Sequence, residues 1–215
     1  MTEKQYDALI IGSGMSGLTV GALLAKAGKR VLIVEKHFKV GGYTHTFKRK
    51  GYEWDVGIHY IGEVNSRKQL VRKFFDHVSE GRLQWSSMSA NYDRIVFPEM
   101  SFDFVAPREK FIDKMVEYFP REESGIKKYL SLLDDVAYQG RKYFSNKALP
   151  KFLANLSYPL MSKKFINYSN KTTKEVITEI SSDPYFLAAL TGQWGDHGLP
   201  PAQSSFVMQA MVTRH

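Results

Sequence analysis

Three glycines and one acidic residue form the pattern in this sequence that is most able to do chemistry. Gly12, Gly14 and Gly17 follow the apolar run Ala8–Ile11 as G-x-G-x-x-G, and Glu35 stands 18 residues after Gly17. In a nucleotide-binding βαβ unit these glycines permit the tight turn, the approach of a pyrophosphate and the close packing of helix on strand. The helix N-terminus offers free N–H groups to the phosphates, and the acid accepts hydrogen bonds from a ribose. The pattern therefore predicts a dinucleotide site.

A glycine-rich turn without a ligand is the alternative interpretation. The surrounding elements argue against it, because the apolar run predicts a buried strand that ends at Gly12. A helix is expected to about Ala27, with Gly28 at its C-terminal cap, and Val31–Val34 predicts the second strand. Strand, helix and acid thus stand where a bound nucleotide needs them.

A second glycine pair, Gly41 and Gly42, follows Glu35 within seven positions. Here the chain resembles the FAD-dependent oxidases and desaturases, in which a second Gly-Gly loop lies over the FAD. The stretch Glu35–Gly62 carries the strings Gly-Gly-x-x-His-Thr-Phe and Asp-x-Gly-Ile-His-Tyr-Ile-Gly. These strings are most similar to the retinol saturase branch, close to phytoene desaturases and carotenoid isomerases. Many members of that family have Arg directly after the two glycines, where this chain has Tyr43.

The resemblance implies FAD as the cofactor. It is specific over Tyr6–Gly62 and looser over Thr191–His215. The residues expected to contact the cofactor are Gly12, Ser13, Gly14, Met15, Ser16, Gly17, Glu35, Lys36, Gly41, Gly42 and Tyr43.

The predicted fold is α/β, with an FAD-binding Rossmann-like βαβ domain over residues 1–80 and a partial α+β substrate domain over residues 81–215. Proteins of the resembled family are longer, and their C-terminal part closes the FAD site. We therefore expect that part to be absent here and this chain alone to be inactive, unless a second chain completes the FAD site. Further strands are expected over Gly51–Val56, Leu83–Trp85, Tyr92–Phe97 and Phe102–Val105, and helices over Arg67–Val78 (capped by Ser66), Pro107–Tyr118, Glu122–Tyr143, Asp183–Thr191 and from Pro200 onward.

Four polar residues near the second glycine pair are the candidates for catalysis. They are His45, Asp55, His59 and Tyr60. One interpretation places them beside the flavin ring or at the mouth of a substrate tunnel, and the other makes them a hydrogen-bonded cluster that shapes the loop. The catalytic residues stay open, because a flavin brings the redox chemistry itself. His197 is a weaker candidate of the same kind.

Composition excludes several classes of protein. There is no cysteine, so disulfides, thiolate zinc sites and a redox-active cysteine pair are excluded. The six histidines show no i, i+4 pairing, and we expect no metal site. The 18 uncharged residues of Ala8–Ala25 are explained by the nucleotide motif rather than by a membrane span. The first seven residues lack the positive region of a signal peptide, so a cytoplasmic protein is expected.

The formal net charge of +8 is concentrated in one segment. Residues 139–174 hold eight Lys or Arg residues and no acid, with aromatic and aliphatic side chains between them. Three interpretations compete: a nucleic-acid groove, an anionic membrane surface and an ordinary solvated face. We favour peripheral membrane contact and no nucleic acid, because the family resemblance implies an apolar substrate that partitions into bilayers.

The predicted function is that of an FAD-dependent oxidoreductase acting on a carbon–carbon bond of a lipophilic, retinoid- or carotenoid-like polyene. The resemblance implies this substrate class, and it does not separate saturation, desaturation and isomerisation. A non-catalytic FAD-binding subunit that needs a partner chain is the first alternative. An amine-oxidase-type flavoenzyme, which needs an aromatic cage near the flavin, is the second.

Overall fold

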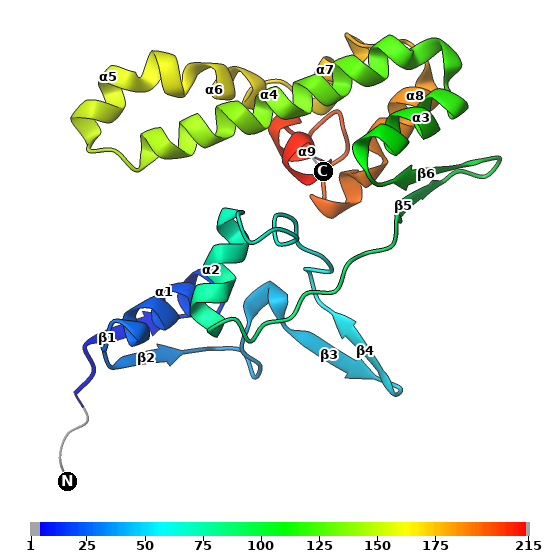
Figure 1. Ribbon diagram of the computed structural model, residues 1–215. Helices are drawn as coiled ribbons and strands as arrows, with labels where there is room; N and C mark the ends of the chain where they lie inside the picture. Colours follow the sequence, from blue (N-terminus) through cyan, green and yellow to red (C-terminus); the bar gives the residue numbers. More distant parts are fainter. Residues whose placement is uncertain (1–4, 214–215) are drawn as a thin grey trace. The chain divides into compact units, whose positions relative to one another are not determined.

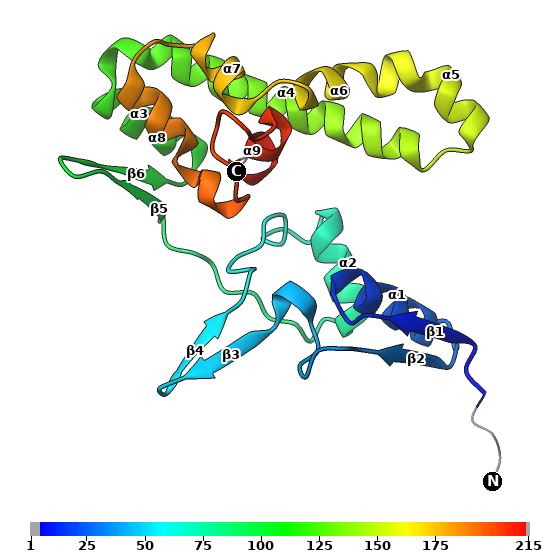
Figure 2. The same cartoon turned by 180° about the vertical axis from the view of Figure 1, so that it is seen from behind.

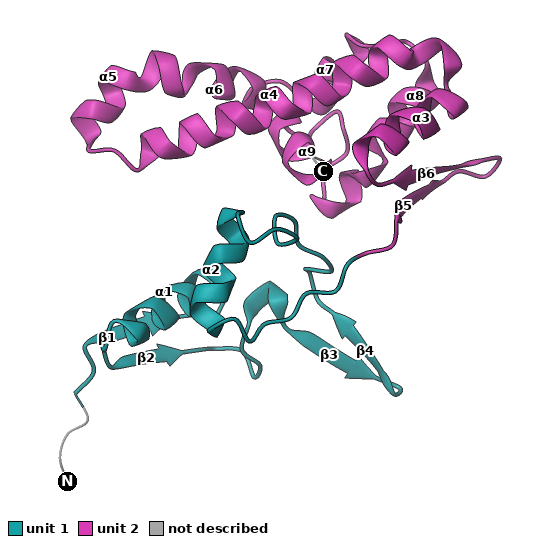
Figure 3. Ribbon diagram, in the orientation of Figure 1, with its two compact units in different colours: residues 1–87 teal, residues 88–215 magenta. Residues whose placement is uncertain are grey.

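The computed structural model describes residues 5–213. The chain forms two compact units, Met1–Ser87 (unit 1) and Met88–His215 (unit 2), coloured separately in Figure 3. The division lies between Ser87 and Met88 rather than between residues 80 and 81.

Unit 1 contains the strand–helix–strand order that the glycine pattern predicts. Strands β1 (Ala8–Ile11) and β2 (Val31–Val34) pair in parallel, and helix α1 (Met15–Lys26) connects them (Figure 1). Ile10 and Ile33 lie against α1. A parallel pair needs such a crossover connection, because its strands run in the same direction.

Only one face of this two-stranded sheet is covered by the described residues of unit 1. Leu9 is 62% exposed and Ile11 is 86% exposed, whereas Ala8 and Ile10, which alternate with them, are half-buried. The prediction that Ala8–Ile11 forms a strand is confirmed, but the prediction that this strand is buried was wrong. Side chains alternate between the faces of a strand, and α1 covers a single face of the pair.

The rest of unit 1 follows the second glycine pair. A 3₁₀ turn η1 (Gly42–Thr44) leads into the antiparallel strands β3 (Thr46–Arg49) and β4 (Tyr52–Asp55), in the register Thr46↔Asp55. Helix α2 (Leu70–Ser79) begins three residues later than predicted and packs on α1.

Two local predictions in unit 1 fail. Ser66 does not cap α2, because the residue before its first turn is Gln69, whose side chain makes no capping bond. Leu83–Trp85 is not a strand. Trp85 instead packs edge-on against Phe75 of α2, with ring centroids 5.2 Å apart, so its burial comes from a helix rather than from a neighbouring strand.

Unit 2 begins with a two-stranded antiparallel sheet. Strands β5 (Asn91–Val96) and β6 (Ser101–Val105) pair as Val96↔Ser101 and Asn91↔Val105, and Arg94 forms an ion pair with Asp103 across them. Their inner side chains include Phe102 and Phe104, each 3% exposed. Sheet and helices occur together in this unit, in agreement with the α+β character expected after the nucleotide unit.

Helices supply most of the core of unit 2. They are α3 (Arg108–Tyr118), α4 (Glu123–Lys147), α5 (Lys151–Met161), α6 (Lys163–Ser169), α7 (Thr173–Thr178), α8 (Pro184–Thr191) and α9 (Phe206–Thr213), with 3₁₀ turns η2 (Pro120–Glu122) and η3 (Gly192–Asp196). The long helix α4 contacts α3, α5, α6 and α9. Its buried face carries Ile126, Tyr129, Leu133 and Val136, each at most 3% exposed.

Helices α5 and α6 run back along α4 as the second arm of a helical hairpin, as the two opposite views in Figures 1 and 2 agree. Neither helix was predicted, and neither was α7, which begins with a capping box between Thr172 and Glu175. Pro200 starts a turn rather than a helix, and α9 begins at Phe206. Within residues 5–213, none of the helices combines the length and apolar character needed to cross a bilayer.

Candidate functional site

The turn after β1 has the geometry that a bound pyrophosphate requires. Gly12 adopts φ +93°, which side chains rarely allow. A Cβ at Gly17 would lie 2.1 Å from the carbonyl oxygen of Gly12, so the helix can start this close to the strand only with glycine there. A Cβ at Gly14, by contrast, would meet no protein atom within 4 Å. The space in front of Gly14 is therefore open.

The N-terminus of α1 points its free donors at the same place. Its first internal bond runs from the Leu18 N–H to the Gly14 carbonyl at 2.9 Å, so the N–H groups of Met15, Ser16 and Gly17 precede the helical ladder. Gly14 brings no side-chain cap, and the first turn carries no acid. The positive end of the helix dipole is thus uncompensated, as suits an anion.

Glu35 lies directly behind this turn. Its Oε2 accepts hydrogen bonds from the Ser13 N–H and the Ser13 hydroxyl, both at 2.6 Å, and its Oε1 accepts from the His37 N–H at 2.8 Å. These bonds, the Ser13 hydroxyl first, lower the pKa of Glu35 to about 2. The carboxylate is therefore ionised at neutral pH. With room for about four hydrogen bonds, it keeps an acceptor position for a ribose hydroxyl.

The second glycine pair packs directly on the first turn. The Gly41 N–H donates to the Ser13 carbonyl at 3.1 Å and also approaches the Ser13 hydroxyl at 3.3 Å. A Cβ at Gly42 would lie 2.9 Å from the Gly14 Cα. Ser13 is only 1% exposed and joins three separate segments of the chain. The sequence placed Ser13 in the phosphate turn but did not reveal that it ties Glu35 to the second loop.

Lys36 and Tyr43, also predicted to contact the cofactor, are exposed. Tyr43 is 78% exposed, and its ring lies over Gly57, where a Cβ would approach the Tyr43 Cδ1 to 3.0 Å. The structure assigns Lys36 no hydrogen bond from its side chain within the described residues. Contact of either residue with a cofactor stays a prediction.

Three of the four candidate catalytic residues gather at one end of the β3–β4 hairpin. The His45 carbonyl accepts from the Val56 N–H at 3.2 Å, which places His45 beside the end of β4 and near Asp55. Asp55 Oδ2 lies 3.8 Å from His59 Nδ1. The His45 ring bonds to the Gly42 carbonyl through Nδ1, so it also shapes the second glycine loop. Tyr60 is 46% exposed.

The sequence reasoning missed a neighbouring pair of residues, His37 and Phe38. The His37 ring lies 4.9 Å from the His45 ring and 4.2 Å from the Phe38 ring, and Phe38 is 90% exposed. They stand two and three residues after Glu35, just beyond the end of β2. The signal was present, because side chains that follow the carboxyl ends of parallel strands line the ligand crevice in such sheets.

His197 lies in unit 2, and its Nε2 is 3.1 Å from the Oε1 of the fully buried Gln209. The Nε2 of Gln209 donates to the Leu190 carbonyl at 3.2 Å. His197 thus belongs to a hydrogen-bonded cluster that ties η3 to α9. Among residues 5–213, no three His, Cys, Asp or Glu side chains come together as a metal site.

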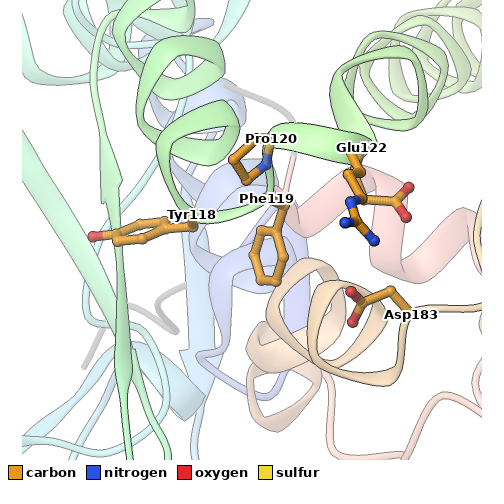
Figure 4. Close-up of a pocket in the computed structure, with 6 residues that line it drawn as sticks. Tyr118, Phe119, Pro120, Glu122 and Asp183 are labelled. Atoms are coloured by element: carbon orange, nitrogen blue, oxygen red, sulfur yellow. The ribbon is translucent and has the colours of Figure 1, made fainter.

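A shallow pocket in unit 2 lies where α3, η2 and the start of α8 meet (Figure 4). It is lined by Tyr118, Phe119, Pro120, Arg121, Glu122 and Asp183. Its carboxylates are committed to the fold: Asp183 caps α8 by accepting from the Tyr185 and Phe186 N–H groups at 2.9 and 3.0 Å, and Glu122 accepts from the Ser181 hydroxyl at 2.8 Å. Both carboxylates of the pocket are therefore engaged in structural hydrogen bonds.

Comparison with known proteins agrees with this geometry. Residues 10–78 match the family model of the NAD(P)-binding Rossmann-like domain. The chain is 35% identical over 222 residues to an all-trans-retinol 13,14-reductase of Danio rerio, an alignment that covers 99% of this chain and 36% of the relative. It is 30% identical over 128 residues to prolycopene isomerase 2 of an Oncidium hybrid cultivar, covering 59% of this chain and 22% of that protein.

Flavin amine oxidases are similar over less of the sequence or only in fold. A flavin-containing amine oxidase of Danio rerio is 40% identical over 74 residues, which cover 34% of this chain and 14% of that protein. A putrescine oxidase structure with bound putrescine superposes with a TM-score of 0.57 at 16% identity, covering 97% of this chain and 41% of the other. At that identity the likeness concerns the fold alone.

The chain spans about a third of the length of the retinol reductases that it matches. The match covers both units, and it includes the glycine turn, the acid at the end of β2 and the second glycine pair. Almost the whole of this chain is thus similar to part of the all-trans-retinol 13,14-reductases, and 59% of it is similar to part of a prolycopene isomerase.

Proposed function

We propose that this chain is the FAD-binding portion of an oxidoreductase that acts on a carbon–carbon bond of a lipophilic, retinoid- or carotenoid-like polyene. The observation that carries the proposal is the junction of the two glycine loops at Ser13, with Glu35 behind it. A site for a nicotinamide dinucleotide alone needs the first loop and the acid, but it does not need the second loop.

The residues fit the pyrophosphate and ribose of FAD. The free N–H groups of Met15, Ser16 and Gly17 would hold the pyrophosphate in the open space before Gly14. The ionised Glu35 would accept from the adenosine ribose. The Gly41–Gly42 loop is held against the same turn, where a larger side chain at Gly42 would collide with Gly14.

The flavin, when bound, supplies the transfer of the electron pair, and the protein supplies position and electrostatics. Ser13 fixes the spacing between the ribose-binding acid and the second loop through its two 2.6 Å bonds to Glu35. We infer that Asp55 orients the His59 imidazole from 3.8 Å. His45, held at Gly42, would place a ring nitrogen near the second loop, where a proton can be held.

The substrate class rests on the names of the relatives. One acts on all-trans-retinol and the other on prolycopene, and both substrates are long apolar polyenes. An amine as substrate is the weaker alternative, because identity to the amine oxidase covers only 34% of this chain.

A cofactor-binding subunit without activity of its own is the second candidate. The exposed face of the β1–β2 sheet favours it, because Leu9 and Ile11 are 62% and 86% exposed. Parallel sheets in α/β proteins are normally covered on both faces. We therefore expect this chain to bind FAD and to need further polypeptide for turnover.

Two measurements test the proposal. The purified chain should retain FAD in preference to NAD⁺ and NADP⁺ in equilibrium dialysis, and preference for a nicotinamide dinucleotide would overturn the cofactor assignment. To test the activity, a chimera is made in which this chain replaces the matching 222 residues of the Danio rerio retinol reductase. The chimera should reduce all-trans-retinol, with a Gly14→Val chimera as the inactive control. A folded, FAD-loaded chimera that transforms no polyene would refute the substrate class.

A further inference from the structure

In the hairpin of α4 and α5 in unit 2, one side of α5 is held against α4 by hydrogen bonds and another side is exposed to solvent. Asn146, 3% exposed near the end of α4, donates from its Nδ2 to the Ala154 carbonyl at 2.9 Å and to the Ser157 hydroxyl at 2.8 Å. Its Oδ1 accepts from the Ser162 hydroxyl at 3.0 Å. These bonds fix which side of α5 faces α4.

The opposite side of α5 is a row of large apolar side chains. Phe152, Leu156 and Leu160 recur every four residues, so they share one face of the helix. They are 77%, 72% and 77% exposed. Neighbouring Leu153 is 46% exposed and Phe144 of α4 is 55% exposed. Single exposed apolar residues are ordinary, but a continuous exposed row marks an interaction surface.

Cations without acidic partners surround this row. The structure gives Arg141, Lys142, Lys147, Lys151 and Lys163 no ion pair within residues 5–213. Two other lysines of the basic segment are neutralised from outside it: Lys164 pairs with Asp135 at 2.8 Å, and Lys171 pairs with Glu179 at 3.0 Å. Within the described residues, six basic residues of this segment therefore have no ion pair: these five, which lie on the hairpin or at its end, and Lys174 in α7.

We propose that this hairpin patch, Phe152, Leu153, Leu156 and Leu160 with Lys147, Lys151 and Lys163 beside them, rests on an anionic lipid bilayer. The charges decide the occupant. An amphipathic helix lies in the interface with its apolar face among the upper acyl chains and its Lys and Arg side chains among the head groups. The bare face of α5 meets the first requirement, and the unpaired lysines at both of its ends meet the second.

The contact does not depend on bound cofactor or on catalysis. Each basic residue near an anionic surface is worth about a fivefold change in partitioning. Neutralising the three lysines should therefore lower binding about a hundredfold at low salt. Salt should weaken the attraction, since the Debye length falls from about 10 Å at 0.1 M to about 3 Å at 1 M.

Co-sedimentation of the purified chain with vesicles tests the proposal. The wild type should sediment with phosphatidylcholine vesicles that contain phosphatidylserine, but not with pure phosphatidylcholine vesicles or in 1 M salt. The variant with Lys147, Lys151 and Lys163 changed to Gln should lose this binding. The matched control changes three exposed lysines outside the patch, Lys68, Lys110 and Lys174, to Gln. This control has the same net charge as the first variant and should retain vesicle binding.

A site-specific probe tests the apolar half of the patch. The chain contains no cysteine, so Leu156→Cys carries a single environment-sensitive fluorophore. Its emission should shift to the blue on anionic vesicles. The same label at Leu70→Cys, where the leucine of α2 is 79% exposed, should not shift.

Several results would overturn the proposal. They are equal loss of binding in both lysine variants, equal binding to neutral vesicles, an unshifted label at position 156, and salt-sensitive binding to single-stranded nucleic acid without any effect of lipid. A dimer that persists in 1 M salt and dissociates on Leu156→Ser would instead identify a second copy of the chain as the occupant.

Discussion

Replacing Gly14 by Ala distinguishes a glycine that a ligand needs from one that the fold needs. The backbone there, with φ −67° and ψ 175°, is extended and open to alanine, and the new methyl group meets no protein atom within 4 Å. Alanine at such a position stabilises by about 0.4–1 kcal/mol through the unfolded chain. Its poorer capping of α1 costs roughly 0.5 kcal/mol. The free energy of unfolding of the ligand-free chain should therefore change by less than about 1 kcal/mol.

The same methyl group should be costly once a dinucleotide binds. It projects into the space before the N-terminus of α1, where the pyrophosphate would lie. A hydrogen bond to a charged group contributes about 1.5–3 kcal/mol. Displacing the pyrophosphate far enough to lose one such bond should lower FAD affinity about ten- to a hundredfold.

The assay combines urea unfolding of the ligand-free proteins with titration of FAD by fluorescence quenching. Gly17→Ala is the contrasting variant, because its Cβ would lie 2.1 Å from the Gly12 carbonyl oxygen and must disturb the turn itself. It should lose stability even without ligand. Unchanged FAD affinity in Gly14→Ala, or unfolding of that variant without ligand, would refute the reasoning.

Four further predictions concern single side chains. Glu35→Gln should weaken FAD binding by about 1–3 kcal/mol, measured by the same titration. Because the pKa of Glu35 is lowered from 4.5 to about 2, the contribution of its carboxylate to folding stability is complete above pH 4.5 and is lost as the pH falls through 2. Ser13→Ala removes the largest cause of this shift, so NMR titration of that variant should show a higher pKa for Glu35. Phe186→Ala, at a side chain with 0% exposure, should lower the free energy of unfolding by about 3–5 kcal/mol in urea. Burial and the 2.6 Å hydrogen bond to Asp135 raise the pKa of Tyr168 to about 12. The contribution of Tyr168 to folding stability is therefore complete below pH 10 and should be lost as the pH rises through 12. Tyr168→Phe should flatten this decline of stability at alkaline pH.

The elements of the nucleotide unit could be predicted because local physics determines them. An apolar run, a glycine turn and a second apolar run leave one arrangement of strand, helix and strand, and β1 and β2 have the predicted bounds. The β3–β4 hairpin was only half predicted. The polar strand β3 (Thr46–Arg49) carries no apolar alternation, and its pairing with β4 is what defines it.

Helix α5 was missed for a different reason, whereas α7 carries a readable signal in the capping box of Thr172 and Glu175. Pro150 and Pro159 suggest breaks, and the basic residues give no amphipathic period that faces a core. The structure shows that polar bonds from Asn146, rather than an apolar stripe, hold α5 against α4. Polar anchoring of this kind depends on which residues meet in space, so pattern reading along the chain does not detect it.

In the candidate site, too, the sequence did not reveal which residues contact one another. The sequence predicted that Ser13 lies in the phosphate turn and that Glu35 faces a ribose. In the structure both donors of Ser13, its N–H and its hydroxyl, are occupied by Glu35 at 2.6 Å. The pyrophosphate must then rely on the N–H groups of α1 that follow Gly14. The ionised Glu35 carboxylate close to an anion site would repel the anion. Hydrogen bonds from Ser13 and His37 stabilise the carboxylate, while the uncompensated positive end of the α1 dipole faces the open space. The turn would thus keep the two negative groups apart, with Glu35 bound by Ser13 and a pyrophosphate held by the N–H groups of α1 in the open space at Gly14.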